Sequence, residues 1–163
     1  MDYDVLIIGA GPAGYVAAIR AGQVGLKVAV VERRYIGGMC LNWGCIPTKV
    51  LLESARRFHK LKEIAEFGID GVVVDKLAFN WEKVKGRSKR ITRKLTAGVN
   101  FLLKKNGVEL IDGVARIGTD RSVWVGDRRI TAGQIIIATG SRPKPMGDAF
   151  LDAPVVEMER LFE

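Results

Sequence analysis

The chain has 163 residues, of which 48% are hydrophobic and 27% charged, values that predict one globular domain with a full core. No apolar run is long enough to span a bilayer, and acidic residues replace the basic flank of a secretory leader, so we expect a cytoplasmic protein with no membrane contact. The net charge is +8 and only two cysteines are present, which in a reducing compartment favours catalytic or metal-binding thiols over a structural disulfide.

The N-terminal residues predict a strand–helix–strand unit that binds a dinucleotide. Residues 4–8 are a short apolar run typical of a buried parallel strand, a helix is predicted over 12–24, and residues 27–31 give a second buried strand. A G-x-G-x-x-G motif joins the first strand to the helix, and its residues are Gly9, Gly11, Pro12, Ala13 and Gly14. The glycines allow a tight turn and a close approach to a pyrophosphate, which the N-terminus of the helix attracts.

Glu32 ends the second strand and restricts the nucleotide that this unit accepts. It follows the glycine motif at the position where an acidic side chain bonds a ribose hydroxyl. A carboxylate there accepts hydrogen bonds from a free ribose diol and repels a 2′-phosphate, which excludes NADP. NAD and FAD are both compatible with Glu32, so the choice between them depends on the cysteine segment.

The segment 37–49 contains both cysteines, Cys40 and Cys45. On a regular α-helix their Cα atoms would lie about 8.6 Å apart, whereas a disulfide needs about 4.4–6.8 Å. A bridged pair therefore requires a departure from the helix, for which Gly44 gives the freedom. Pro47 predicts that the regular helix begins only just beyond it. A ring this small adds little stability, so a bridge here is suited to being opened and closed.

Other uses of the two cysteines are less favoured. A structural zinc site needs four protein ligands, but the chain has two cysteines and one histidine, so no metal site is predicted. A thioredoxin-like site would show C-x-x-C spacing, and two buried thiols without a role are the plain alternative. Lys49, one helical turn beyond Cys45, is predicted to place a cation near the thiolate and a cofactor ring and to lower a thiol pKa. A solvated lysine is the alternative for Lys49.

Two long helices are predicted next, over residues 47–67 and 79–105, the second broken or kinked near Gly86. Residues 82–105 contain nine basic residues and one acidic residue, so this segment carries the whole net charge of +8. The favoured interpretation is the solvated basic face of an amphipathic helix, and docking of an acidic partner is the alternative. No recognition motif accompanies the charge, so nucleic acid is not a predicted partner.

The later residues predict short strands. One is expected to be parallel, three to form an antiparallel meander and the last to be buried, over residues 108–111, 114–117, 121–125, 128–131 and 134–138. Thr139-Gly140-Ser141 follows, and Pro143 and Pro145 break any regular element beyond it. His59, the only histidine, is predicted to be a surface residue of the first long helix.

These motifs together resemble the flavoprotein disulfide reductases, the class I pyridine nucleotide-disulfide oxidoreductases, and among them the dihydrolipoamide dehydrogenases. The resemblance rests on GAGPAG at 9–14, Glu32, GGMCLNWGCIPTK at 37–49 and IATGS at 137–141, in the family's order. It implies an α/β, Rossmann-like three-layer FAD-binding domain with a parallel sheet and a small antiparallel β-meander. That domain would comprise residues 1–146, and residues 147–163 would form a connector toward a nicotinamide-binding domain.

The resemblance also implies a role for each motif. FAD would lie extended along the glycine motif with Glu32 on the adenosine ribose, Cys40 would exchange with the disulfide substrate, and Cys45 would make charge-transfer contact with the isoalloxazine ring. Lys49 matches a lysine near flavin N5. Further cofactor contacts are implied for Arg33, Gly38, Met39, Ala115, Thr139, Gly140 and Ser141. The chain departs from the family at Met39, often threonine, and at Trp43, often valine.

The implied reaction passes electrons from dihydrolipoamide through Cys40–Cys45 and FAD to NAD. The implied partners are a lipoyl or other disulfide substrate, a second copy in a homodimer, and a 2-oxoacid dehydrogenase complex. The family's nicotinamide site and its catalytic His-Glu pair have no counterpart in the sequence, so we expect little or no turnover by this chain alone. Two rivals stay open: a mercuric reductase or another disulfide reductase of the family, and a truncated FAD-binding module without catalysis.

Overall fold

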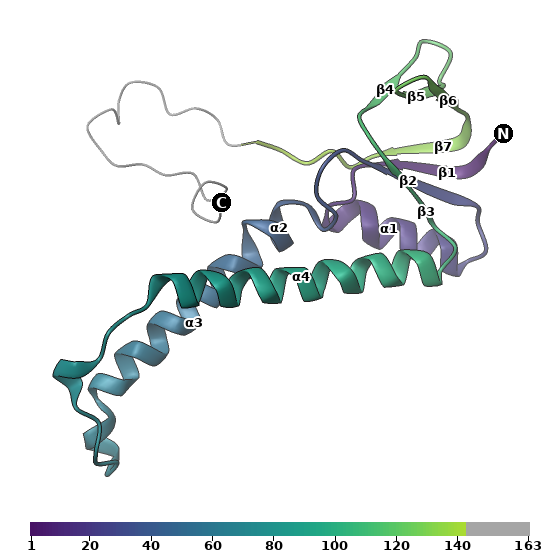
Figure 1. The fold of residues 1–163 in the computed structure, drawn as a ribbon. Coiled ribbons are helices and arrows are strands. Elements are labelled where there is room, and N and C mark those ends of the chain that lie inside the picture. The colour runs from purple at the N-terminus through teal and green to yellow at the C-terminus, as the bar shows by residue number, and fades with distance from the viewer. Residues whose placement is uncertain (143–163) are drawn as a thin grey trace, which may run out of the picture.

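The computed structural model describes residues 1–142, which form an α/β fold in three layers (Figure 1). The middle layer is a parallel sheet of strand order β3-β2-β1-β7, formed by Glu109–Asp112, Val28–Glu32, Tyr3–Ile8 and Ala132–Ile137. Helices α1 (Pro12–Gln23) and α4 (Trp81–Lys105) pack on one face. The antiparallel meander on the other face consists of β4, β5 and β6, at Ala115–Ile117, Val123–Val125 and Arg128–Ile130. The predicted Rossmann-like fold class is confirmed.

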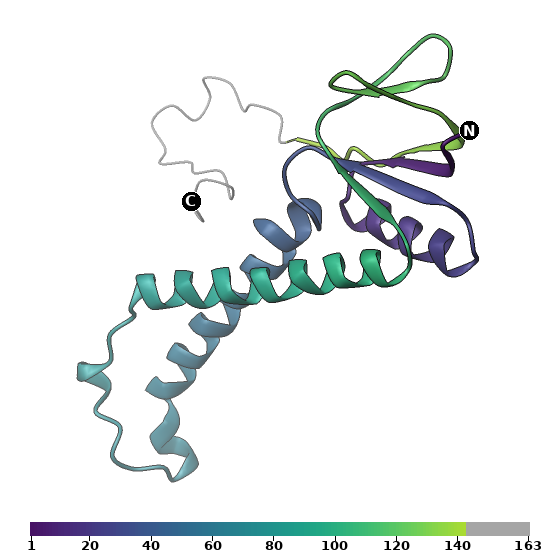
Figure 2. The same ribbon diagram turned by 45° about the vertical axis from the view of Figure 1, so that its right-hand side comes forward.

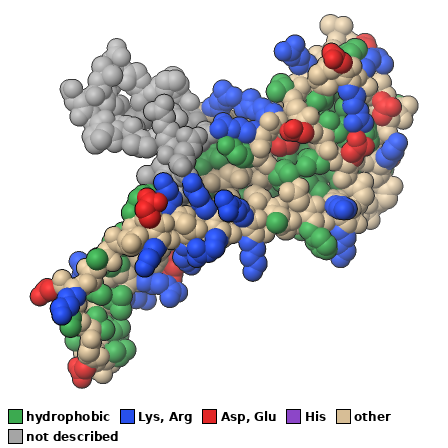
Figure 3. Space-filling view, in the orientation of Figure 1, with side chains coloured by type: hydrophobic (Ala, Val, Ile, Leu, Met, Phe, Trp, Pro, Cys, Tyr) green, Lys and Arg blue, Asp and Glu red, His purple; other side chains and the backbone are tan. Residues whose placement is uncertain are grey.

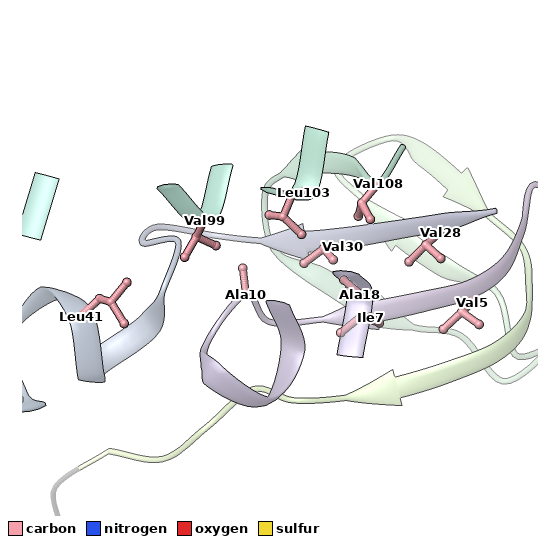
Figure 4. Close-up of a cluster of buried hydrophobic side chains, with 10 residues drawn as sticks. All are labelled: Val5, Ile7, Ala10, Ala18, Val28, Val30, Leu41, Val99, Leu103 and Val108. Atoms are coloured by element: carbon pink, nitrogen blue, oxygen red, sulfur yellow. The ribbon is translucent and has the colours of Figure 1, made fainter. Parts of the chain in front are cut away.

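Aliphatic side chains on both faces of the sheet form the core. Along β1, Val5 and Ile7 contribute to the cluster under the helices, whereas Leu6 and Ile8 contribute to the cluster under the meander. Figure 4 shows the helix-side cluster, in which Val99 and Leu103 of α4 face β1 and β2. A strand buried on both faces has a continuous apolar sequence instead of an alternating one, which is why β1 and β2 were predictable.

The connection from β2 to β3 carries the helices α2 (Gly38–Asn42), α3 (Cys45–Lys62) and α4. Helices α3 and α4 pack against each other and project together away from the sheet (Figure 2). Two 3₁₀ turns, η1 (Ile64–Phe67) and η2 (Val74–Lys76), lie in the link between them. The short helix α2 is therefore placed where the projecting pair of helices meets the sheet.

Three sequence predictions are wrong in detail. The predicted break near Gly86 is absent, because α4 is one continuous helix of 25 residues and one glycine costs a helix only roughly 1 kcal/mol. The first long helix ends at Lys62, and only a 3₁₀ turn continues to Phe67. The strand near the C-terminus forms as β7, but it is not buried. Among the strands of residues 1–142 it pairs only with β1, at the sheet edge, and Ile137 is 65% exposed.

The basic segment forms the exposed side of α4. Lysine and arginine side chains gather along this helix in Figure 3, and six of them are exposed: Lys83, Arg90, Arg93, Lys94, Lys104 and Lys105. His59 is also exposed, as predicted, and its Nε2 lies 3.1 Å from Oε1 of Glu63, the residue that follows α3. Within residues 1–142 no helix is long and apolar enough to cross a membrane. The predicted connector, residues 147–163, and the end of the predicted FAD domain after residue 142 lie outside the described residues, as do Pro143 and Pro145.

A polar network links the meander to the parallel sheet. The Tyr3 hydroxyl donates to Glu109 Oε2 (2.6 Å), while Arg128 donates to Glu109 Oε1 (3.0 Å) and to the Tyr3 hydroxyl (2.9 Å). The hydrogen bond from Tyr3, followed by that from Arg128, lowers the pKa of Glu109, although burial acts against it. Burial and the hydrogen bond to Glu109 raise the pKa of Tyr3.

Acid is therefore expected to weaken the folded state through Glu109. A carboxyl whose pKa is lowered by folding stabilises the chain above its unfolded pKa of about 4.3, and this stability is lost as the pH falls through the folded value. In urea unfolding at about pH 7, 5 and 3, Glu109→Gln should lose less stability between the first and last pH than the unsubstituted chain. Glu82→Gln, at a side chain that is 78% exposed, is the control. Identical pH slopes for Glu109→Gln and the unsubstituted chain would contradict the assignment.

Candidate functional site

The glycine motif turns the chain from β1 into α1 at the point where β1 lies between β2 and β7. A Cβ atom on Gly14 would lie 1.8 Å from the carbonyl oxygen of Gly9, so the first turn of α1 packs directly on the end of β1. Gly9 itself has φ +104°, and a Cβ atom there would lie 2.3 Å from the carbonyl oxygen of Ala138. In open α/β sheets, ligands bind in the crevice beyond the carboxyl ends of such strands.

The N-terminus of α1 offers hydrogen-bond donors at this crevice. Gly11 precedes the helix, Pro12 is its first residue, and no side chain caps it. The first backbone N–H groups of a helix have no partner within the helix, and the helix dipole adds a partial positive charge there. A Cβ atom on Gly11 would have no neighbour closer than Gly38 Cα at 3.9 Å, so the bare backbone leaves open space. The end of α1 is thus suited to a phosphate group.

Glu32 is held by backbone amides at the end of β2. Its Oε2 accepts from Ala10 N (2.8 Å), and its Oε1 accepts from Arg34 N (2.9 Å) and Tyr35 N (3.2 Å). A carboxylate has about four acceptor positions, so these three bonds fix its orientation, and within residues 1–142 they leave one position on Oε2 open. These donors were not predicted from the sequence. They orient Glu32 toward the crevice and leave it able to accept a hydroxyl.

The start of α2 is fixed directly against the glycine motif. Gly37 N donates to Ala10 O (2.8 Å), and a Cβ atom on Gly38 would lie 2.8 Å from Gly11 Cα. Gly37 and Gly38 both have positive φ, of +86° and +59°. Only residues without a side chain allow this approach at that conformation. The glycine pair before Cys40 therefore brings the cysteine segment next to the N-terminus of α1.

The two cysteines lie on either side of a break between two helices. Cys40 is on α2, Cys45 is the first residue of α3, and Trp43 and Gly44 between them are non-helical. The predicted departure from helix geometry is thus present. The helix begins two residues earlier than predicted from Pro47, because proline is tolerated in the first turn, where its missing N–H would have no partner. Both cysteines are free thiols, Cys40 half-buried and Cys45 exposed.

The thiols interact with each other. The pKa of Cys40 is raised, first because its thiol donates a hydrogen bond to the Cys45 side chain, then because of burial and repulsion by a charge on Cys45. The Cys45 N–H and the Lys49 ammonium act in the opposite direction without reversing the shift. Lys49 therefore lowers the pKa of Cys40, as predicted, but the hydrogen bond to Cys45 and burial raise this pKa by more. The raised pKa favours the protonated thiol at Cys40.

One cavity of about 680 Å³ joins the glycine motif to the cysteines. It brings together thirteen of the predicted site residues: Gly9, Gly11, Pro12, Ala13, Glu32, Arg33, Gly38, Met39, Cys40, Cys45, Thr139, Gly140 and Ser141. A second cavity of about 350 Å³ reaches Ala115 and shares Gly9, Glu32 and Arg33 with the first. Gly14 and Lys49 line neither cavity, since Gly14 is buried against Gly9 and Lys49 is on the exposed side of α3.

Sequence reasoning did not assign Arg34, Tyr35, Trp43 and Arg142 to the site, although all four line the larger cavity. The Tyr35 and Trp43 rings meet edge to face with centroids 5.1 Å apart, and the Arg34 guanidinium lies 4.6 Å from the Tyr35 centroid. Tyr35 and Trp43 could have been assigned to the site from their positions in the sequence, since Tyr35 follows Glu32 closely and Trp43 lies between the two cysteines. In the described part of the chain, no group of three or more metal-ligating side chains is close enough to hold a metal ion.

Comparison with known proteins agrees with this geometry. A family model described as pyridine nucleotide-disulphide oxidoreductase matches residues 3–156. Dihydrolipoyl dehydrogenase of Acholeplasma laidlawii is 45% identical over 86% of this chain and 41% of its own length. The Rhizobium etli dihydrolipoyl dehydrogenase is 44% identical over 89% of this chain and 34% of its own length. That of Thermus scotoductus is 46% identical over 88% of this chain and 30% of its own length. The chain thus spans 30–41% of the length of these relatives. It belongs to the pyridine nucleotide-disulphide oxidoreductase family.

Proposed function

We propose that this chain binds FAD and carries the redox-active disulfide of an oxidoreductase that acts on dihydrolipoyl groups. The observation that carries the proposal is the single cavity lined by the glycine motif, Glu32 and both cysteines. A nucleotide-binding crevice that opens onto two thiols requires a cofactor with a redox-active ring at the end near the thiols. FAD meets this requirement, because its isoalloxazine ring accepts an electron pair directly from a thiolate. A nicotinamide ring exchanges electrons only as hydride, which a thiolate does not supply.

Different residues of the crevice would bind different parts of FAD. The backbone N–H groups at the N-terminus of α1 would donate hydrogen bonds to the pyrophosphate, and Gly11, without a side chain, leaves room for it. Glu32 accepts a ribose hydroxyl at its free position, and its negative charge disfavours a 2′-phosphate. The second cavity, at Ala115, takes the adenine end, and the cysteine end of the first cavity takes the ring. When bound, FAD supplies two-electron redox chemistry beside the thiols.

Cys40 and Cys45 perform thiol–disulfide exchange in this proposal. A substrate thiolate attacks the Cys40 sulfur of the disulfide, forms a mixed disulfide and displaces Cys45 as a thiolate. The second substrate thiol loses its proton, attacks the substrate sulfur of the mixed disulfide and releases Cys40. Counted from its dithiol form, the substrate loses two electrons and two protons. The cysteine pair gains the electrons, and the protons pass to the released cysteine thiolates or to solvent. The hydrogen bond from Cys40 to Cys45 fits this assignment, because it raises the pKa of Cys40 and so favours a proton on the thiol that the substrate releases last.

The choice of a dihydrolipoyl substrate rests on the similar proteins, which are named dihydrolipoyl dehydrogenases. NAD as the final acceptor, the homodimer, the 2-oxoacid dehydrogenase complex and a cytoplasmic location belong to the same proposal and rest on the family alone. So does the division into an FAD-binding domain, residues 1–146, and a connector.

Flavin binding tests the proposal at Gly11. The purified chain should bind FAD more tightly than FMN or NAD and bind NADP most weakly, as measured by calorimetric titration. Gly11→Ala should weaken FAD binding by about tenfold or more, since its methyl group occupies the space next to the pyrophosphate. The fold should tolerate it, because the new Cβ meets nothing closer than 3.9 Å. The control is Gly98→Ala, in α4, whose Cβ would have no neighbour within 4 Å. A folded chain that binds no FAD, or binding unchanged by Gly11→Ala, contradicts the proposal.

A further inference from the structure

The C-terminal end of α2 is held by a side chain from a distant helix. The Thr92 hydroxyl of α4 donates a hydrogen bond to the carbonyl oxygen of Leu41 at 3.1 Å, across 51 residues of sequence. Leu41 directly follows Cys40 and is itself buried in the helix-side core. The bond therefore connects the backbone next to the first cysteine with a helix that is anchored in the same core.

This contact is not the usual one for a threonine in a helix. Helical threonines commonly donate to a carbonyl one turn earlier in their own helix. Thr96, one turn further along α4, does this, because its hydroxyl lies 3.1 Å from both Thr92 O and Arg93 O. Thr92 instead reaches α2. The two threonines thus share a helix and a residue type but differ in what their hydroxyls hold.

The other hydrogen bonds described for the end of α2 are local. Asn42 Nδ2 donates to Ile36 O (3.0 Å) and Gly38 O (2.8 Å), and the N–H groups of Trp43 and Gly44 donate to Met39 O at 3.0 and 2.7 Å. These bonds shape the turn internally but do not fix it relative to the rest of the molecule. A five-residue helix also has carbonyls without intrahelical partners, and Leu41 O is one that Thr92 satisfies.

We propose that Thr92 is a positioning residue for the cysteine pair, holding Cys40 opposite Cys45 so that the disulfide closes more readily. The inference rests on the proposed function, in which these two thiols form a disulfide. With Leu41 O fixed, Cys40 samples fewer positions and its sulfur stays near Cys45. The effective concentration of one thiol near the other is then higher than in a turn that is free to move.

Exchange with glutathione measures this effect without any bound cofactor. The Cys40–Cys45 dithiol reduces glutathione disulfide: the glutathione S–S bond breaks, the Cys40–Cys45 bond forms, and the two protons pass to two glutathione thiols. The equilibrium constant follows from alkylating the remaining thiols at a series of glutathione ratios and weighing the products by mass spectrometry. Thr92→Val removes the hydroxyl at nearly constant shape, Thr92→Ser retains it, and Thr96→Val is the matched control.

Thr92→Val should lower the equilibrium constant for disulfide formation by about 3- to 10-fold, the range expected for loss of one hydrogen bond. This corresponds to a rise in reduction potential of about 15–30 mV. Thr92→Ser and Thr96→Val should stay within about twofold of the unsubstituted chain, a pattern that general loss of helix stability would not produce. If Thr92→Val does not fold, Thr92→Ala against Thr96→Ala gives the same comparison with a strong helix former.

Two results would distinguish failure of the Thr92 inference from failure of the proposed function. A disulfide that forms normally in the unsubstituted chain and equally in Thr92→Val, or Thr92→Ala, overturns the role of Thr92 alone. Failure of the unsubstituted chain to form any Cys40–Cys45 disulfide overturns the proposed function itself, and with it the inference.

Discussion

Replacing Gly14 with alanine is expected to destabilise the fold by about 3 kcal/mol or more. The new Cβ would lie 1.8 Å from the carbonyl oxygen of Gly9 and 2.9 Å from its carbonyl carbon, and both atoms are backbone that cannot rotate away. Relief requires moving α1 off β1, which opens the helix-side core at Ala18 and Ile7. Urea unfolding monitored by circular dichroism measures the loss.

Gly86→Ala is the matched control for this substitution. Gly86 also lies in a helix, but a Cβ atom there would meet nothing within 4 Å. Alanine favours the helix over glycine by roughly 1 kcal/mol, so this variant should be slightly more stable than the unsubstituted chain. The two glycine substitutions are thus expected to change stability in opposite directions. Equal unfolding midpoints for Gly14→Ala and the unsubstituted chain would show that α1 does not pack on β1 as described.

The second large effect is expected at the cysteines. In Cys40→Ser or Cys45→Ser, oxidation should close no intrachain disulfide, so disulfide exchange should fall to the level of an isolated thiol. After treatment with glutathione disulfide, the unsubstituted chain should lose two alkylatable thiols without gaining the mass of glutathione. Each serine variant should instead retain its thiol or carry one glutathione. Full glutathione adducts on both cysteines of the unsubstituted chain would show that the pair does not close.

The Cys45→Ser variant has a further expected consequence, for the pKa of Cys40. The largest cause that raises this pKa is the hydrogen bond to the Cys45 side chain, and a charge on Cys45 adds to it. Without the Cys45 thiol the pKa of Cys40 should fall, so the pH dependence of its alkylation should shift to lower pH. Lys49→Met should shift it to higher pH, since the ammonium group lowers the pKa. Unchanged alkylation profiles would contradict the described contact.

The proposed site is a continuous crevice because two glycine-rich segments approach each other. The backbones of Gly11 and Gly38 are so close that a Cβ atom on Gly38 would lie 2.8 Å from Gly11 Cα. The hydrogen bond from Gly37 N to Ala10 O holds the two segments together. The N-terminus of α1, where the proposal places the pyrophosphate, and the cysteine turn are consequently neighbours in space. This placement gives the thiols access to the same cavity as the nucleotide motif, on which the proposed function depends.

The sequence by itself determined the elements whose signals are local. The apolar runs of β1 and β2, the glycine motif and Glu32 define the nucleotide-binding unit, because strand burial and tight turns are visible within a few residues. The cysteine spacing likewise predicted that a bridged pair requires a departure from the helix, and the helix is interrupted at Trp43 and Gly44 between the two free thiols.

Only the tertiary structure decided features that join distant residues. β7 is exposed because it lies at the sheet edge, and edge position depends on strand order, which no short pattern encodes. The amides that orient Glu32 and the packing of Tyr35 on Trp43 arise from the path of the loop after β2. The hydrogen bond from the Thr92 hydroxyl to Leu41 O exists because α4 packs against α2. Each depends on which residues meet after the core has packed, and local sequence does not determine that.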